Sequence, residues 1–167
     1  MAAVPTVVVA RRCWRVLAPR WAHAPLSGAG SAGNGGRFNR PGVAALYLSE
    51  DLLTAVAEYQ QELGVRPGTF CAYDVDAAPV VDLVDPKVRE ACGVTLRDLR
   101  CPWKQIALVA GGTPPTWNLA DRLMSSGHAG LRVTSVMHPG GVNVVLWRWN
   151  DDPSRTVAVL DPNIDLP

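Results

Sequence analysis

The sequence contains no apolar run long enough to cross a membrane. Its longest N-terminal run, VPTVVVA at residues 4–10, is far shorter than the about 20 residues that a membrane helix needs. Two arginines follow this run, whereas a signal peptide carries its positive charges before the apolar segment. We therefore expect a cytoplasmic protein with no membrane segment.

The chain also lacks an excess of charge of either sign. It has 16 Lys and Arg against 15 Asp and Glu, so its net charge is +1 at pH 7. Proteins that bind nucleic acid or anionic membranes usually carry a positive excess, because Lys and Arg neutralise phosphate groups. The sequence gives no reason to expect either partner, and partners have to be inferred from individual sites.

Cysteines are few and do not have metal-binding spacing. The four lie at positions 13, 71, 92 and 101, with no CxxC pair and no histidine at ligand spacing. Zinc sites are built from such closely spaced ligands, so the sequence predicts no metal site. We expect ordinary thiols in a reducing compartment.

Neither an internal repeat nor an interdomain linker interrupts the 167 residues, which are enough to bury one core. We therefore expect a single domain, residues 1–167. Segments rich in β-branched residues predominate around a few helices and do not alternate with them, which favours an α+β fold. The predicted strands are residues 7–17, 43–49, 69–77, 79–85, 130–135, 141–150 and 156–161.

Three segments carry helix signals, at residues 50–64, 85–93 and 117–127. The first has Ser49 as its expected N-cap and Gly64 as its end. Its predicted buried face consists of apolar residues at helical spacing, namely Leu52, Val56, Tyr59 and Leu63. The second is opened by Asp85 and Pro86. Residues 18–36 are predicted as a long loop, and residues 93–116 are not assigned.

Residues 31–42, SAGNGGRFNRPG, place glycine and proline around Arg37. Glycine allows close backbone approach, and a guanidinium group can bond two phosphate oxygens at once, which suits a phosphate or diphosphate ligand. The segment is neither a P-loop nor a GxGxxG loop, because no Gly-Lys-Ser/Thr follows and no strand-to-helix frame surrounds it. A surface turn with a solvated arginine explains it equally well.

Other polar residues are equally open to ordinary interpretations. Arg15 stands between apolar neighbours in a predicted strand, where it either holds an anion or lies on an exposed edge. Glu58 falls on the helix face opposite the predicted apolar face, which is typical of a solvated glutamate. Ser135 and His138 suggest a hydrolase, but no GxSxG motif accompanies them.

Taken together, these segments strongly resemble the RES-domain family, which is named for its Arg, Glu and Ser. The similarity runs from about residue 12 to the C-terminus and is least close over residues 65–116. It is carried by WRV, SGAGSAGNGGRFN, ALYLS, AVAEY, AGLRVTS and GGVNVVL, in that order. Its most specific part is GGRFN followed by LYLS and a helix with AxxE.

The resemblance implies a fold similar to ADP-ribosyltransferase toxins, with two small antiparallel sheets that enclose an NAD cleft and are flanked by helices. It assigns the family's Arg, Glu and Ser to Arg37, Glu58 and Ser135. Family members often have Pro before that serine, where this chain has Thr134. Two neighbouring serines, Ser125 and Ser126, are alternatives for the assignment.

The resemblance also implies binding roles along the substrate. Arg37, assisted by Arg15 on the first strand, would hold the diphosphate of NAD. Tyr47 would stack on the nicotinamide ring, and Ser135 would orient Glu58 or a ribose hydroxyl. Asn143 is a candidate hydrogen-bond donor behind the residues that bind NAD. NAD is thus expected as the substrate, with Glu58 stabilising the positive charge that develops on the ribose.

On this resemblance the chain is expected to be the toxin of a bacterial toxin–antitoxin pair. Its partner would be a helix-turn-helix antitoxin that blocks the cleft, in a 2:2 or larger complex. The acceptor of ADP-ribose is open between a protein side chain, water and phosphate, with a lean toward mono-ADP-ribosylation of a protein. Residue 56 is Val, so the ExE pattern of arginine-modifying enzymes is absent.

Two interpretations from other classes stay open on the sequence alone. One is a binding module that senses NAD or ADP-ribose without chemistry, which would release no nicotinamide. The other is an interaction subunit in which Arg37 and Glu58 are surface residues and NAD does not bind.

Overall fold

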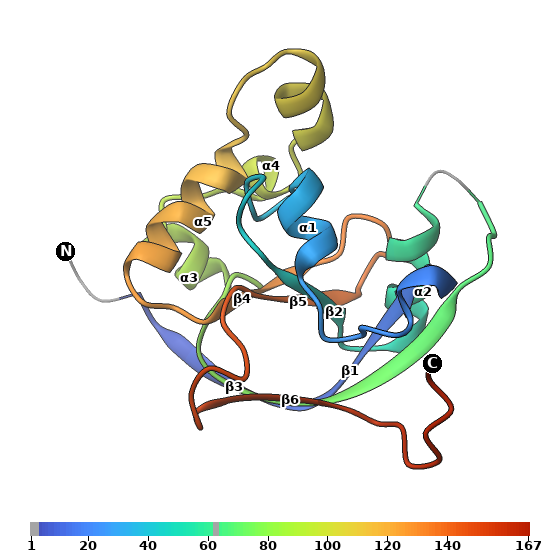
Figure 1. Ribbon diagram of the computed structural model, residues 1–167. Coiled ribbons are helices and arrows are strands. Elements are labelled where there is room, and N and C mark those ends of the chain that lie inside the picture. Colours follow the sequence, from blue (N-terminus) through green and yellow to red (C-terminus); the bar gives the residue numbers. More distant parts are fainter. Residues whose placement is uncertain (1–3, 62–63) are drawn as a thin grey trace.

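The computed structural model describes residues 4–61 and 64–167 (Figure 1). Its six strands form one sheet in the order β1-β2-β5-β4-β3-β6, and a further β1–β3 pairing closes the first five into a barrel. All pairs are antiparallel except β3–β4. The strands are β1 (Thr6–Leu17), β2 (Leu46–Ser49), β3 (Thr69–Asp82), β4 (Gly130–Thr134), β5 (Val142–Leu146) and β6 (Arg155–Val159).

The expectation of a mixed fold of strands and helices is confirmed, but the expectation of two antiparallel sheets is wrong. Strands β1 and β3 pair along nearly their whole length, from Thr6↔Val81 to Leu17↔Thr69. Because they are so long, their neighbours differ along their length: the end of β3 pairs with β4, and Trp14 of β1 pairs with Ser49 of β2. The two predicted strands 69–77 and 79–85 are thus largely one strand that joins both halves of the sheet.

The helices lie mainly on one side of this barrel (Figure 1). The predicted helices at 85–93 and 117–127 are confirmed, and Asp85 caps the first of them by accepting from the Lys87 backbone N–H. Short helices also occur where none was predicted, in 18–36 and 93–116. The helices are η1 (Pro19–Trp21), α1 (Ala29–Asn34), α2 (Leu52–Gln60), α3 (Pro86–Ala91), α4 (Leu96–Leu99), η2 (Gln105–Val109) and α5 (Pro115–Ser125).

Helix α2 is present where predicted, but its cap and its buried face differ from the prediction. Its N-cap is Asp51, whose side chain accepts from the Thr54 backbone N–H, and not Ser49. The buried residues are Thr54 and Ala55, whereas Leu52 is 38% exposed. The polar residues of the helix have partners instead: Thr54 Oγ1 lies 2.8 Å from His138 Nδ1, and Glu58 accepts from Ser135 and Asn143. Leu63, also predicted on the buried face, lies outside the described residues.

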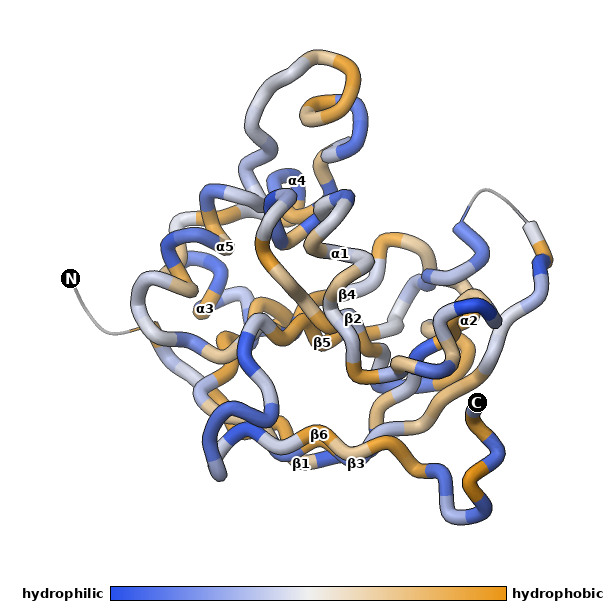
Figure 2. The backbone as a smooth tube through the Cα atoms, viewed as in Figure 1, coloured by the Kyte–Doolittle hydropathy of each residue, from blue (hydrophilic) through white to orange (hydrophobic). Residues whose placement is uncertain are grey.

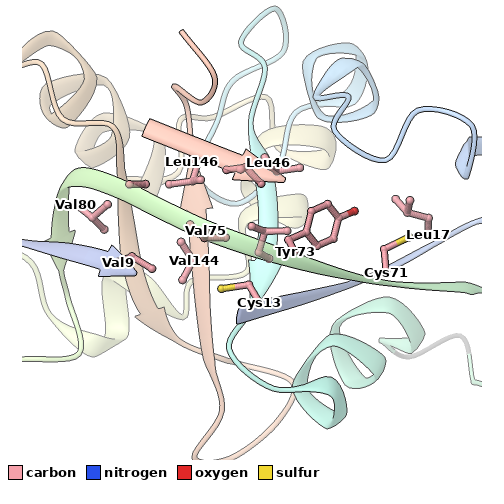
Figure 3. Close-up of a cluster of buried hydrophobic side chains, with 13 residues drawn as sticks. Val9, Cys13, Leu17, Leu46, Cys71, Tyr73, Val75, Val80, Val144 and Leu146 are labelled. Carbon is pink, nitrogen blue, oxygen red and sulfur yellow. The ribbon is translucent and has the colours of Figure 1, made fainter. Parts of the chain in front are cut away.

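Two apolar cores lie on the two faces of the sheet. One fills the barrel, where Val9, Tyr73 and Val144 belong to a single cluster of buried side chains (Figure 3). The other lies outside the barrel, where Leu131 and Val145 pack with residues of α3, α4 and α5. In Figure 2 the central strands are accordingly mostly hydrophobic in colour, and the turn before β6 is hydrophilic.

The structure holds all four cysteines as free thiols, three of them buried and Cys92 half-buried. Burial raises the pKa of the Cys13 thiol to about 12. Within residues 4–61 and 64–167, no cluster of His, Cys, Asp and Glu is arranged to hold a metal ion. In the same ranges, no helix combines the length and apolar character needed to span a membrane.

Candidate active site

Strand alternation gathers polar side chains at one end of the outer sheet face. Neighbours along a strand point to opposite faces, so Tyr47 and Ser49 share a face of β2. The register places them opposite Val145 and Asn143 of β5. Val145 belongs to the outer core, which identifies this face as the outer one. The face is therefore apolar in its middle and polar where Ser49 and Asn143 meet.

Glu58 is held at this polar end by two donors. Its Oε1 accepts from the Ser135 hydroxyl at 2.7 Å and from Asn143 Nδ2 at 2.6 Å. The three residues come from α2, the segment after β4, and β5. Within the described part of the chain, the second carboxylate oxygen, Oε2, accepts no protein hydrogen bond. Glu58 is thus held by the protein through one carboxylate oxygen.

The Ser135 hydroxyl is oriented by its own turn. Its Oγ accepts from the backbone N–H groups of Met137 and His138, at 3.1 and 3.0 Å. With those lone pairs used, its single hydrogen is directed to Glu58. The alternatives for the family serine lie elsewhere: Ser125 and Ser126 are exposed at the end of α5, and the Ser126 hydroxyl donates to the Arg122 carbonyl.

Ser49 is a member of this group that the sequence did not identify. Its hydroxyl donates to Asn143 Oδ1 at 2.8 Å, and its side chain is only 3% exposed. This bond fixes the amide so that its Nδ2, and not its oxygen, faces Glu58. From the sequence, Ser49 was predicted to cap the helix. Its contact with Asn143 could not be predicted, because only the β2–β5 register places the two residues opposite each other.

Arg37 lies on the same side of the molecule and is half-buried. Its Nη1 donates to the carbonyl oxygens of Leu99 and Cys101, at 3.2 and 2.6 Å. Leu99 is the last residue of α4, so Arg37 satisfies a carbonyl that the helix itself leaves unpaired. Burial lowers the pKa of Arg37, while the acidic groups of Cys101, Glu58 and Tyr47 act against this shift.

Tyr47 and the glycine-rich segment fit together through Asn39. The Tyr47 hydroxyl donates to Asn39 Oδ1 at 2.6 Å and accepts from the Phe38 backbone N–H at 2.9 Å. Asn39 is fully buried and donates to the carbonyls of Ser31 and Val43. Burial raises the pKa of Tyr47, so the phenol stays protonated at neutral pH.

Gly36 shows why this segment needs glycine. A Cβ atom at this position would overlap the Tyr47 hydroxyl and lie 2.6 Å from Asn39 Oδ1. The glycine therefore makes room for the bonds that hold the loop next to Arg37. Gly33, in the same segment, has open space where a Cβ atom would be.

Arg15 is placed apart from the other predicted residues. It shares a face of β1 with Cys13 and Leu17, which belong to the core inside the barrel. Its Nη1 donates to the Pro25 and Ser27 carbonyls at 3.4 and 3.5 Å, and burial lowers its pKa. The structure thus brings Arg37, Tyr47, Glu58, Ser135 and Asn143 to one region, and it shows no hydrogen bond between Arg15 and these described residues.

The sequence of this protein matches the family model of the RES domain over residues 12–167. The chain belongs to the RES-domain family. This confirms the resemblance seen in its motifs. No curated protein gives a significant sequence match to this RES-domain chain.

Seven chains of solved structures match the fold of the RES-domain chain. One is from the crystal structure of the M. tuberculosis MbcT–MbcA toxin–antitoxin complex, with a TM-score of 0.66 and 20% sequence identity. The alignment covers 95% of this chain and 88% of that chain. At this identity the similarity concerns the fold.

Proposed function

We propose that this RES-domain chain is a toxin that cleaves the bond between nicotinamide and ribose in NAD. The observation that carries the proposal is the single carboxylate of Glu58, held through one oxygen by Ser135 and Asn143. Its negative charge favours the charged form of the nearby Arg37 and so acts to raise the pKa of that residue. The family membership supports it, and the fold is shared with a chain of a toxin–antitoxin complex.

The reaction needs one carboxylate because of how NAD breaks. The electron pair of the C–N bond leaves with the pyridinium nitrogen, so nicotinamide departs as a neutral molecule and needs no acid. Positive charge develops on the ribose, as it does in glycoside hydrolysis. A fixed negative charge below the sugar stabilises this state, and such a preorganised group contributes about 3–4 kcal/mol. Glu58 is the proposed source of that charge.

The remaining residues are proposed to position NAD. Arg37 holds the diphosphate by charge-assisted bonds, for which its remaining N–H groups are available. Ser135 and Asn143 fix one Glu58 oxygen, and the second takes a ribose hydroxyl. Tyr47 anchors the loop of Arg37 and offers its ring to nicotinamide. Arg15, on the inner face of β1, is left out of the proposed site.

The acceptor completes the reaction and defines the activity. A nucleophile adds to the ribose carbon that nicotinamide leaves and loses a proton. We favour a protein side chain as the acceptor, which makes the chain a mono-ADP-ribosyltransferase. Water or phosphate as acceptor would make it an NAD glycohydrolase or phosphorylase that depletes NAD.

Incubation with NAD labelled in its adenosine part tests the activity and identifies the acceptor together. We expect released nicotinamide with label fixed to protein in a host extract. Free labelled ADP-ribose, or its 1″-phosphate, would instead assign water or phosphate as the acceptor. Bound NAD without any nicotinamide release would contradict the enzyme and favour the non-catalytic binding module.

We further propose that a helix-turn-helix antitoxin binds the chain and closes the cleft. The crystal structure that shares this fold contains a toxin together with an antitoxin, which supports such a partner.

A further inference from the structure

The segment from Cys101 to Lys104 borders the candidate site. At one end the Cys101 carbonyl accepts from Arg37 at 2.6 Å. At the other end, Lys104 Nζ donates to Gln61 Oε1 at 2.9 Å. Gln61 follows α2 three residues after Glu58, so it lies about one helical turn further along the chain. The four residues therefore run from the proposed diphosphate anchor to the helix that carries the carboxylate.

Trp103 stands in the middle of this segment and is half-buried. Its ring packs against Trp117 with ring centroids 6.5 Å apart and planes tilted by 45°. Trp117 is 7% exposed, and its Nε1 donates to the carbonyl of Gly36, the neighbour of Arg37. The position of Trp103 is thus coupled to the Arg37 loop through a buried tryptophan.

Part of the Trp103 side chain is accessible to solvent. The ammonium of Lys104 lies over the Trp103 ring, 5.9 Å from its centroid, and Lys104 is an exposed residue. A large aromatic ring kept partly in solvent beside a polar site costs hydration free energy, unless a ligand covers it. Planar bases are suited to such a ring, because stacking buries both surfaces.

We infer that Trp103 is the base-binding residue of this site and stacks on the adenine of NAD. The inference rests on the proposed function. In NAD the adenosine and the nicotinamide riboside extend from opposite ends of the diphosphate. With Arg37 on the diphosphate, the adenine needs a surface next to Arg37. Trp103 provides it, because it packs on Trp117, which bonds the Arg37 loop. Stacking reads the flat shape of a base, so a guanine analogue of NAD binds with similar affinity.

Binding measurements in a Glu58→Gln background test this role, since that variant is expected to bind NAD without cleaving it. Trp103→Ala should lower the affinities for NAD and ADP-ribose about ten- to one hundred-fold, which is the range for the loss of one base–aromatic stack. Nicotinamide mononucleotide, which has no adenine, should bind as before. Trp103→Phe should restore most of the NAD affinity, and Trp103→Leu should not, because it keeps apolar bulk without an aromatic face.

Trp21→Ala is the matched control, because Trp21 is 52% exposed on η1 and stacks near His23. This control variant should bind NAD, ADP-ribose and nicotinamide mononucleotide with unchanged affinity. Unchanged NAD affinity in Trp103→Ala would overturn the inference. This result is also the one expected if Trp103 contacts a partner protein and not NAD. Equal losses for nicotinamide mononucleotide and NAD would also overturn it. A parent chain that binds no NAD would instead contradict the proposed function itself.

Discussion

At the scale of single residues, the candidate site depends on Glu58 and on the donors that hold it. A solvated glutamate would need no partners, whereas this one accepts two side-chain bonds from residues 77 and 85 positions away. Ser49 in turn fixes the Asn143 amide by donating a hydrogen bond to its oxygen. Such an arrangement restricts the carboxylate to one position, which is what a charge that stabilises a transition state requires.

Replacing Glu58 by Gln removes the charge and keeps the size of the side chain. If Glu58 stabilises the cationic ribose, the rate of nicotinamide release should fall about 100-fold or more, while NAD still binds. Release rates and NAD affinities measured on the same preparations check this. Release of nicotinamide by Glu58→Gln at the parent rate would exclude the mechanism. Growth arrest of cells that express Glu58→Gln without antitoxin would lead to the same conclusion.

Arg37→Ala should mainly weaken NAD binding. Loss of a charge-assisted contact with the diphosphate should cost about 2–4 kcal/mol of binding free energy. Calorimetric titration with NAD measures this loss. The substitution also leaves the Leu99 and Cys101 carbonyls without Arg37, so Arg37→Lys is the companion variant that keeps the charge. An unchanged affinity in Arg37→Ala would remove this residue from the site.

At the scale of elements, the glycine-rich segment contains two glycines that are predicted to behave differently. Gly36→Ala should displace Tyr47 and Asn39, because the new Cβ overlaps both. We expect a loss of stability of about 1–3 kcal/mol, typical of overpacking, together with weaker NAD binding. Gly33 lies within α1 and has open space where a Cβ atom would be, so Gly33→Ala should fold and bind NAD normally. Thermal unfolding and NAD titration of both variants check the contrast, and equal behaviour would contradict it.

Helix α2 has a cap whose loss should affect both stability and activity. Burial opposes the ionisation of Asp51, but hydrogen bonds from the Thr54 side chain and backbone outweigh it and lower the pKa of Asp51. The cap should therefore stabilise the fold above the ordinary pKa of 3.8, and this stabilisation should disappear as the pH falls through the lower folded value.

Asp51→Ala should cost about 0.5–2 kcal/mol of unfolding free energy at neutral pH. It should also slow nicotinamide release, because α2 carries Glu58. Asp85→Ala is the control, since Asp85 caps α3 in the same way and lies on a different helix. Denaturant unfolding and activity assays on both variants separate the effects. Equal losses of activity would show that only general stability is involved.

At the scale of the whole molecule, the proposed antitoxin should bind tightly enough to block NAD cleavage at stoichiometric ratios. Closed symmetric assemblies are the common outcome for such complexes, so we expect a 2:2 or larger complex by light scattering. Nicotinamide release measured across a titration with purified antitoxin checks the inhibition. Undiminished cleavage at an excess of antitoxin would contradict this part of the proposal.

The sequence predicted most strands and the helices α3 and α5, because their patterns depend on neighbouring residues only. It did not predict that β1 and β3 close a barrel, since pairing between Thr6 and Val81 is set by distant contacts. The apolar spacing in α2 gave the wrong buried face for the same reason. The orientation of this helix depends on the bonds of Glu58 to Ser135 and Asn143, which are distant in sequence. Family motifs pointed to Arg37, Glu58 and Ser135, but no local pattern marks the Ser49–Asn143 contact.

The order in which the ribosome makes the chain gives this arrangement a further consequence. Arg37 and Glu58 are synthesised well before Ser135 and Asn143, which hold the carboxylate. Asn143 also lies on β5, which joins β2 and β4 in the barrel. A nascent or prematurely terminated chain therefore carries the charged residues without the geometry. Translation itself delays the assembly of the site until Ser135 and Asn143 have been made.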